Sequence, residues 1–372
     1  MKVESVKIYG FRNLTGVDGE LNLEFNGGVN VLRGLNAQGK TNMVEAIYFC
    51  ATAHSHRTSV TNEMIRFGGE HARIQIITAR DTGGYANKVN VLLRNTGKNR
   101  AIKSAAVNGV AVGKLEDLLG VLYCVIFSPE DLSLIKAGPS ERRRFMDMEL
   151  CQVNRVYFYE LKQYYKILKQ RNALLRSLQK NNTAHLLETL ELWDAQLAEC
   201  GERIAVIRRI YVEELNVLAA KIHHGLCGEE LQASYKPSSP PNELADKIKK
   251  NRYRDIQTGT TNTGIHKDDI TFLLNGLDSR VYASQGQQRT AALSLKLAEV
   301  ELIRREKGEN PVLLLDDVMS ELDNKRQEQL IENIGGIQTF ITCTTAENIF
   351  KIKKAAEYVV DGGKIERLKS KD

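Results

Sequence analysis

The clearest chemistry in the sequence lies in a glycine-rich segment near the N-terminus. Residues 34–41 read Gly-Leu-Asn-Ala-Gln-Gly-Lys-Thr, and the stretch Gly27-Gly-Val-Asn-Val-Leu-Arg33 before them predicts a strand that leads into this loop. The glycines allow a tight turn whose backbone N–H groups face one point, while Lys40 adds an ammonium group and Thr41 a hydroxyl. These are the groups that bind the phosphates of a nucleotide and its Mg²⁺ ion. The amphipathic residues that follow predict the helix that such a loop requires.

Two carboxylates stand directly after another apolar run, far along the chain. Residues 312–315 read Val-Leu-Leu-Leu and are followed by Asp316 and Asp317. An open α/β sheet places its ligands at the carboxyl ends of buried parallel strands. We therefore expect Asp316 to hold the Mg²⁺ shell and Asp317 to polarise the water that attacks ATP. Ser320 and Asp323 come next, in the order Ser-Glu-Leu-Asp.

A third motif precedes these acids and defines the kind of ATPase. Residues 284–289 read Ser-Gln-Gly-Gln-Gln-Arg and begin a predicted helix, residues 290–305. The chain thus contains, in order, this motif, a helix, a strand that ends in two acids, and Ser-x-Leu-Asp. That order is the signature, Walker B and D-loop series of ABC-type ATPases. A helix start with Ser284 and Gly286 is an anion site, but the chain already has one for its own ATP. We therefore expect the site at Ser284 and Gly286 to bind the γ-phosphate of ATP held by a second copy of the chain, in a head-to-tail dimer. We also expect Ser284 to cap the helix.

A long segment separates the two halves of the expected ATPase. Residues 142–221 contain almost no Gly or Pro, and apolar residues recur at helical spacing. A break at residues 181–183 predicts two antiparallel helices, and the Pro-rich residues 237–241 predict the exit from them. The sequence predicts an α/β fold: an ABC-type, SMC-like P-loop ATPase head that is discontinuous in sequence, residues 1–135 and 264–372, with an inserted, mainly helical arm domain at residues 136–263.

Composition agrees with this organisation. A chain of 372 residues with 42% hydrophobic residues is large enough for two domains. Six cysteines with no Cys-x-x-Cys pair indicate a reducing compartment and argue against a zinc site. Apolar runs such as residues 121–127 are far shorter than the roughly 20 residues of a membrane span, and the N-terminus has no apolar signal core. We expect a soluble cytoplasmic protein without a membrane partner.

Positive charge is concentrated in the first helix of the predicted arm. The chain carries a formal net charge of +6, and residues 151–180 alone hold seven basic side chains against one acidic one. Five of the seven recur on one helical face and are called the basic stripe below. The stripe could lie along a phosphate backbone, or it could be a solvated face that pairs with acids of the return helix. The stripe is Lys162, Lys166, Lys169, Arg176 and Lys180, and the acids are Glu188, Glu191, Asp194, Glu199 and Glu202.

A second basic group, the arginine cluster, consists of Arg142, Arg143 and Arg144 and follows the turn at Gly138-Pro139. These side chains could contact DNA or brace the arm against the ATPase.

A series of short motifs extends from end to end of the chain. They are Phe11-Arg-Asn13, Asn36-Ala-Gln-Gly-Lys-Thr-Asn42 with Glu45-Ala-Ile47, Ser55-His-Arg-Thr58, Phe127-Ser-Pro-Glu-Asp131, Arg142-Arg-Arg-Phe145, Thr263-Gly-Ile-His-Lys-Asp-Asp269 and Ser284-Gln-Gly-Gln-Gln288. Together these motifs resemble those of the bacterial RecF family. The resemblance implies an ABC-type ATPase of the SMC class that binds DNA, as a duplex or a single-strand/duplex junction, and dimerises with ATP. It also implies a role in DNA repair, recombination, replication and the SOS response, with RecO and RecR as partners in loading recombinase at gapped DNA.

The resemblance also assigns roles to individual residues. Lys40 and Thr41 would bind phosphate and Mg²⁺, Asp316 would bind Mg²⁺ through water, and Asp317 would be the catalytic acid. Ser284, Gly286 and Gln287 would cap the ATP of the partner, with Ser320 and Asp323 in the D-loop. The remaining residues expected around the nucleotide are Arg12, Gly34, Asn36, Gln38, Gly39 and Asn42.

Three positions depart from the wider ABC pattern. Asp317 stands where Glu is usual, Thr344 stands at the switch position where His is usual, and Phe127-Ser-Pro-Glu130 replaces a Q-loop glutamine. We therefore expect a weak, DNA-stimulated ATPase that uses slow hydrolysis as a switch. The roles of His56, Arg57 and His266 stay open.

Other functions use the same ATPase motifs. A transporter subunit would need a Q-loop glutamine and an apolar coupling surface, which the missing glutamine and the basic arm argue against. An SMC-like chromosome factor would act on a different partner. A nuclease would need an Asp-x-Asp cluster after the ATPase, where residues 364–371 are largely basic instead.

Overall fold

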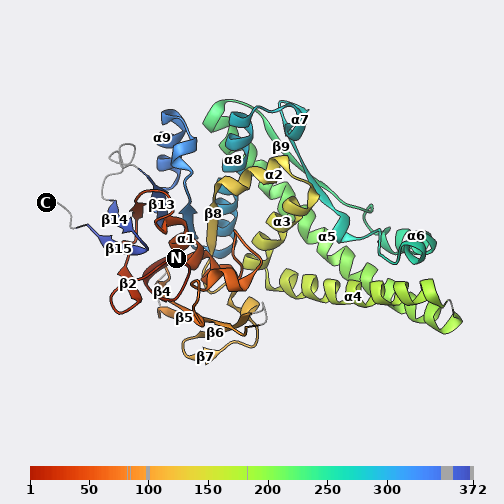
Figure 1. The fold of residues 1–372 in the computed structure, drawn as a ribbon. Coiled ribbons are helices and arrows are strands. Elements are labelled where there is room, and N and C mark those ends of the chain that lie inside the picture. The colour runs from red at the N-terminus through yellow and green to blue at the C-terminus, as the bar shows by residue number, and fades with distance from the viewer. Residues whose placement is uncertain (82, 84, 98–100, 182, 345–354, 369–372) are drawn as a thin grey trace. The chain divides into compact units, whose positions relative to one another are not determined.

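The computed structural model describes residues 1–81, 83, 85–97, 101–181, 183–344 and 355–368, and for Glu321 the backbone alone. Contacts within the chain define two compact units, Met1–Asp131 with Glu299–Asp372 and Leu132–Ala298. The boundary between Ala298 and Glu299 lies inside helix α8 (Gln285–Lys307), which is labelled in Figure 1. The units differ from the expected head and arm in residues 132–135 and 264–298, which group with the helical unit.

The first unit contains two six-stranded sheets. One is antiparallel, with buried apolar and exposed residues alternating along its strands, as in a sheet that covers a core with one face. The other is parallel except for one edge strand. The antiparallel order is β2 (Glu20–Glu24), β1 (Lys2–Tyr9), β4 (His71–Ala79), β5 (Asn87–Asn95), β6 (Ala101–Val107) and β7 (Val110–Ala111). The parallel order is β15 (Lys364–Arg367, the antiparallel edge), β14 (Ala356–Asp361), β3 (Val29–Arg33), β13 (Thr339–Cys343), β12 (Val312–Leu315) and β8 (Cys124–Phe127).

The parallel sheet confirms the two strands expected before the glycine-rich loop and before Asp316, which are β3 and β12. Every residue of β12 and β13 is buried, because both faces of the sheet are covered. β3 and β12 flank β13, so the carboxyl ends of these three strands meet at one edge of the sheet. The glycine-rich loop and the two carboxylates therefore come together although they are far apart in sequence.

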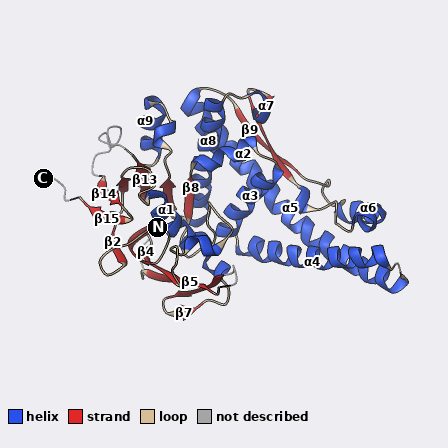
Figure 2. Cartoon of the chain, in the orientation of Figure 1, coloured by secondary structure: helices blue, strands red, loops and turns tan. Residues whose placement is uncertain are grey.

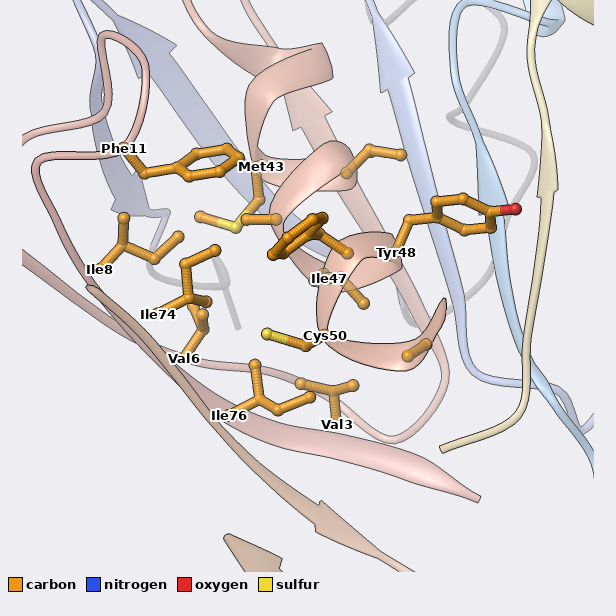
Figure 3. Packing of buried hydrophobic residues seen from close by; sticks show 14 of the residues in the cluster. Val3, Val6, Ile8, Phe11, Met43, Ile47, Tyr48, Cys50, Ile74 and Ile76 are labelled. Atoms are coloured by element: carbon orange, nitrogen blue, oxygen red, sulfur yellow. The ribbon is translucent and has the colours of Figure 1, made fainter. Parts of the chain in front are cut away.

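Helix α1 (Lys40–Thr52) lies in the core between the two sheets. From Met43 to its end every residue of the helix is buried, Glu45 included, so the helix lacks the exposed face of the amphipathic helix that the sequence predicts. Figure 3 shows Met43, Ile47 and Cys50 of α1 with apolar side chains of β1 and β4, including Val6 and Ile76. The helix that begins at the glycine-rich loop is thus held rigidly, and so are the side chains at its first turn. Shorter elements of this unit are η1 (Thr61–Met64), η2 (Leu115–Leu118), η3 (Pro129–Asp131), η5 (Met319–Glu321) and α9 (Asn324–Asn333).

The second unit is mainly helical, as Figure 2 shows. Its helices are α2 (Leu132–Lys136), α3 (Pro139–Val153), α4 (Arg155–Lys180), α5 (Ala184–Cys227), α6 (Leu244–Thr258), η4 (Ile265–Lys267), α7 (Ser279–Tyr282) and the start of α8. A three-stranded antiparallel sheet has the order β11 (Leu277–Asp278), β10 (Asp269–Leu274) and β9 (Leu231–Lys236).

Helices α4 and α5 form the expected antiparallel pair. Arg203 of α5 bonds Glu160 near the start of α4 at 2.9 Å, and Leu190 packs on Leu178 near its end. The break between the helices falls within residues 181–183, as predicted; Asn182 lies outside the described residues. The Pro-rich residues 237–241, by contrast, do not leave the helical unit. They join β9 to α6, which packs on α5.

Two arginines are buried completely in the helical unit. Arg171 donates to Asp194 and Asp255 at 2.7 Å, and Arg208 donates to Asp147 at 2.7 Å and to Asp268 at 3.0 Å. Unpaired charges of this kind would be strongly destabilising inside a protein, so the carboxylates must accompany them. Arg171 is one of the seven basic side chains in residues 151–180 but lies outside the basic stripe, and buried carboxylates compensate its charge.

Candidate functional site

The glycine-rich loop connects β3 to α1 and depends on backbone positions that favour glycine. Gly39 has φ +117°, and a Cβ there would lie 2.8 Å from the side-chain oxygen of Asn13. Gly34 has no room for a side chain, because a Cβ would lie 2.2 Å from the carbonyl oxygen of Val360. The loop is thus confined by the Asn13 side chain at Gly39 and by the Val360 backbone at Gly34, and neither position leaves room for a larger residue.

Neighbouring segments of the first unit hold this loop in place. The Asn13 amide donates to the Gln38 carbonyl oxygen at 3.2 Å, and the side chain of Asn42 donates to Asn13 at 2.7 Å. The turn between β14 and β15 donates from Gly363 N to the Gln38 carbonyl oxygen at 2.9 Å and from Gly362 N to Gln38 Oε1 at 2.6 Å. The side chain of Gln38 therefore positions the loop, whereas Asn36 is exposed on it.

Lys40 points back into the loop. Its Nζ donates to the carbonyl oxygens of Gly34 at 2.5 Å and Leu35 at 2.8 Å, and the residue is buried. Burial lowers the pKa of Lys40, while the charges of Asp317 and Asp316 act to raise it. The ammonium group is therefore the cation that lies among the backbone groups of the loop, where a phosphate would be bound.

Thr41 and Asp316 bring the two expected Mg²⁺ ligands together. The Thr41 hydroxyl donates to Asp316 Oδ1 at 2.9 Å, and Thr342 of β13 donates to the same oxygen at 2.7 Å. Burial raises the pKa of Asp316, the two hydroxyls lower it, and the nearby charge of Glu130 raises it. A hydroxyl and a carboxylate oxygen are the hard donors that Mg²⁺ binds, so these residues fit that ion. Neither Thr342 nor Glu130 was among the expected site residues.

Asp317 follows in a constrained backbone conformation. Its φ is +56°, its N–H donates to the Thr342 hydroxyl at 2.9 Å, and Ser320 Oγ donates to its carbonyl oxygen at 2.8 Å. Ser320 Oγ also lies 3.2 Å from Asp317 Oδ1, so the D-loop serine and the second acid are in contact. Asp323 caps α9 by accepting the N–H of Arg326 at 2.9 Å, and Thr344 is exposed directly after β13.

Arg12 binds the buried carboxylate of Glu45. Its guanidinium donates to both oxygens of Glu45, at 2.8 and 2.9 Å, and to the Glu63 carbonyl oxygen at 2.6 Å. Burial would raise the pKa of Glu45, but hydrogen bonds from Arg12 and Ser55 and the charge of Arg57 bring it below its ordinary value. Arg12 thus ties the N-terminal segment to α1, and its expected contact with nucleotide stays a prediction.

His56 and Arg57 lie beside this pair. Arg57 donates to the Asn42 side chain at 2.8 Å and to Glu45 at 3.4 Å. Burial lowers the pKa of His56 to about 4, and its ring nitrogens have no hydrogen-bond partner among the described residues. The imidazole packs edge-on against Tyr48 and is neutral at pH 7.

The signature motif lies in the second unit, at the start of α8. Ser284 Oγ accepts the N–H of Gln287 at 3.3 Å, and Gln287 Oε1 accepts the N–H of Ser284 at 2.9 Å. This reciprocal pair is a capping box, which confirms Ser284 as the helix cap. Ser284 and Gly286 are exposed, and Gln287 also donates to Glu229 at 2.6 Å.

The basic stripe on α4 is largely solvent-exposed. Lys162 is the exception, because it is half-buried with its ammonium 5.2 Å from the ring centre of Phe158. Within the described part of the chain no ion pair joins the stripe to an acid of α5. Glu191 pairs with Arg252 instead. Of the two alternatives for the stripe, pairing with acids of the return helix is therefore not found among the described residues.

The arginine cluster divides into inward and outward side chains. Arg142 is buried and donates to both oxygens of Asp269, at 2.7 and 2.9 Å. Arg143 donates to the Asp268 carbonyl oxygen at 2.7 Å, and Arg144 is exposed. The DNA contact expected for Arg142 is corrected, because its guanidinium braces α3 against β10 within the helical unit.

His266 also has an internal role in this structure. Its Nδ1 lies 2.8 Å from the Tyr164 hydroxyl, and its Nε2 lies 3.0 Å from the Thr261 carbonyl oxygen. Burial lowers the pKa of His266 to about 4.

None of the helices in the described residues combines the length and hydropathy of a membrane span.

Comparison with known proteins first defines a class. The RecF/RecN/SMC N-terminal domain family matches residues 2–364. The Smc head bound to the C-winged helix domain of ScpA has a similar fold, with a TM-score of 0.58 at 15% identity over 100% of this chain and 98% of that one. Fold and motifs together define an ABC-type ATPase head of the SMC class.

Relatives with higher sequence identity place the chain in one family within this class. The DNA replication and repair protein RecF of Lachnospira eligens is 44% identical over 366 residues, 96% of this chain and 98% of its own length. RecF of Lachnoclostridium phytofermentans is 44% identical over 371 residues, 99% of this chain and 100% of its own length. A structure of the recombination mediator protein RecF with ATP has a TM-score of 0.91 at 35% identity, covering 99% of this chain and 97% of its own. The chain belongs to the RecF family of DNA replication and repair proteins.

Proposed function

We propose that this protein binds ATP and Mg²⁺ at the loop of residues 34–41 and uses them to switch its hold on DNA. The observation that carries the proposal is the 2.9 Å contact between the Thr41 hydroxyl and Asp316 Oδ1, with Lys40 inside the same loop. Thr41 and Asp316 would hold Mg²⁺, directly or through water, and Lys40 would bind the β- and γ-phosphates. Mg²⁺ supplies neutralisation of the charge that develops on the phosphates.

Hydrolysis would be slow. Asp317 is the proposed acid that orients water, but its carboxylate is one methylene shorter than the usual glutamate and already contacts Ser320 Oγ at 3.2 Å. Thr344, at the switch position, carries no imidazole. A long-lived ATP state suits a switch, since the complex with DNA then persists until hydrolysis resets it.

The ATP state would be a head-to-tail homodimer. Ser284 and Gly286 are exposed at a helix start whose N–H groups favour an anion, and the capping box holds that start in shape. A second copy would present its γ-phosphate there, with Ser320 and Asp323 near the seam. Two such composite sites close a two-fold dimer.

DNA would bind along the exposed part of the basic stripe, Lys166, Lys169, Arg176 and Lys180. These side chains have no acidic partners among the described residues and stand on one face of α4, so they can bind successive phosphates. Arg144 is a further candidate contact. A duplex or a single-strand/duplex junction would fit such a sequence-independent surface.

RecO and RecR are proposed as partners in loading recombinase at gapped DNA. The proposal is supported by the RecF relatives, of which one solved structure is described as a recombination mediator in the RecFOR pathway. Recombination, the SOS response and a cytoplasmic location belong to the same proposal. A transporter or a different SMC-like partner receives no support from the family to which the chain belongs.

The test is DNA binding by gel shift with and without a slowly hydrolysed ATP analogue, on duplex, single-stranded and gapped DNA at two salt concentrations. We expect tighter binding with the analogue and a steep loss of binding at the higher salt concentration. Equal affinity with and without the analogue would contradict an ATP-operated switch.

A further inference from the structure

A cluster of three metal-ligating side chains lies at the end of α5, in the second unit. His223 and Cys227 are one helical turn apart, and Glu229 follows at the turn into β9. His223 Nε2 lies 3.4 Å from Cys227 Sγ and 3.9 Å from Glu229 Oε2, and Cys227 Sγ lies 3.7 Å from that same oxygen. The three ligand atoms therefore converge on one point.

The hydrogen bonds of His223 orient its ring toward this point. Ser294 Oγ donates its proton to the Thr290 carbonyl oxygen at 2.7 Å, so it can only accept from His223 Nδ1, which lies 2.9 Å away. The proton of the neutral imidazole is thereby placed on Nδ1, and the lone pair of Nε2 faces Cys227 and Glu229. A second hydrogen bond that fixes the tautomer in this way is typical of histidines that bind metals.

The spacing of the three atoms matches a tetrahedral site. With a Zn–S distance of about 2.3 Å and Zn–N and Zn–O distances of about 2.0–2.2 Å, tetrahedral ligand atoms lie about 3.3–3.6 Å apart. The three observed separations, 3.4, 3.7 and 3.9 Å, require only a small inward movement of the Glu229 carboxylate. A soft thiolate and an imidazole select Zn²⁺ over Mg²⁺ or Ca²⁺. His223 is fully buried, whereas Cys227 and Glu229 are partly exposed, so the cluster is in contact with solvent that can supply a water ligand.

The cluster is joined to the signature motif. While Glu229 Oε2 faces the histidine and cysteine, its other oxygen accepts from Gln287 Nε2 at 2.6 Å. Gln287 in turn accepts the N–H of Ser284 through its amide oxygen. A metal that fixed Glu229 would fix Gln287 and the start of α8 with it.

We propose that His223, Cys227 and Glu229 bind one Zn²⁺ ion, with water as the fourth ligand, and that this site stabilises the start of the signature helix. The effect of the metal on ATP-driven dimerisation rests on the proposed function, but metal binding does not. The site is therefore tested in the absence of ATP and DNA, so that either proposal can fail without the other.

The experiment measures Zn²⁺ bound per chain by competition with a chromophoric chelator, and the absorption of the Co²⁺-substituted protein. Wild type is expected to bind one ion and to show a thiolate-to-cobalt charge-transfer band, because a proton leaves the Cys227 thiol when the metal binds. Cys227→Ser should lose the band, and Glu229→Gln should lose affinity. The matched controls His224→Gln and Glu230→Gln change exposed neighbours and should bind as wild type does.

Ser294→Ala separates metal binding from packing. It removes the group that orients His223 but leaves all three ligands, and we expect the Zn²⁺ affinity to fall about 10- to 100-fold. Circular dichroism establishes that each variant is folded. His223→Gln changes a fully buried position, so its Zn²⁺ affinity is interpreted together with that of Cys227→Ser. If wild type and Cys227→Ser bind the same amount of Zn²⁺, or the cobalt band survives in Cys227→Ser, the cluster is a hydrogen-bonded thiol and imidazole and not a metal site.

Hydrogen exchange tests the link to the signature. Amides of residues 284–290 should exchange more slowly when Zn²⁺ is added to wild type, and at an unchanged rate when it is added to Cys227→Ser. Metal binding without this protection would overturn the proposed effect on α8.

Discussion

Replacing Glu45 with glutamine tests the buried junction between α1 and the N-terminal segment. Glu45 is fully buried and binds Arg12 through two hydrogen bonds and Ser55 through one of 2.5 Å. A glutamine keeps the shape but removes the charge and one acceptor, leaving a partly buried guanidinium without its counter-ion. Breaking a buried pair costs about 3–5 kcal/mol. We expect about 3 kcal/mol, because the amide oxygen of glutamine can still accept one bond.

The change should be visible in both heat and denaturant. For a cooperative unit of roughly 200 residues, each kcal/mol lowers Tm by about 2–4 °C, so Tm should fall by about 6–12 °C. Urea unfolding at pH 7 gives the free energy of unfolding directly. Glu63→Gln is the matched control, because the Glu63 side chain is exposed and only its backbone carbonyl contacts Arg12.

The loss should also depend on pH in a defined direction. The folded-state pKa of Glu45 is below its ordinary value of 4.5, so its charge stabilises the fold fully above about pH 4.5 and less as the pH falls through the folded pKa. Glutamine does not titrate, so wild type and variant should converge in acid. A loss below about 0.5 kcal/mol at pH 7, the range of ordinary surface changes, would refute the reasoning, as would a difference that does not shrink in acid.

Three further predictions concern the proposed function. Lys40→Arg should abolish ATP-driven dimerisation and turnover, since a planar guanidinium cannot replace the ammonium held by two loop carbonyls. Asp317→Asn should still bind ATP and give longer-lived dimers. Light scattering measures dimerisation and phosphate release measures turnover; Asp317→Asn dimers that dissociate as fast as wild-type dimers would show that Asp317 does not act in hydrolysis. Ser284→Arg should bind ATP as a monomer but fail to dimerise. Mixing it with Lys40→Arg places both lesions in one composite site and none in the other, so turnover should reappear; mixed dimers without turnover would argue against shared sites. Reversing Lys166, Lys169 and Arg176 to Glu should weaken duplex binding at all sequences alike and reduce the log–log salt slope by about one for each phosphate that is no longer bound, with ATP binding unchanged. In wild type the ATP-dependent gain in affinity should exceed about tenfold at moderate salt. Unchanged affinity and slope in the triple variant would make the stripe a solvated face.

Local spacing was sufficient for the parts of this protein that are built from consecutive residues. The glycine-rich loop, the all-apolar strand before Asp316, the helix cap at Ser284 and the break after α4 each depend on a few neighbouring positions. Backbone conformation and helix capping act over that range, so the sequence predicts them. The resemblance to the RecF family was visible for the same reason, since it rests on short motifs.

Tertiary structure alone decided which charged and polar side chains meet. Arg142 and Arg171 look like surface charge in the sequence, yet each is buried against carboxylates that follow it at a long distance along the chain. Thr342 reaches Asp316 only because β13 pairs with β12. The cysteine count argued against zinc, whereas the turn after α5 gathers three different ligand types that no cysteine spacing would reveal. Burial and ion pairing depend on which distant segments the fold brings together, and a pattern of neighbouring residues does not contain that information.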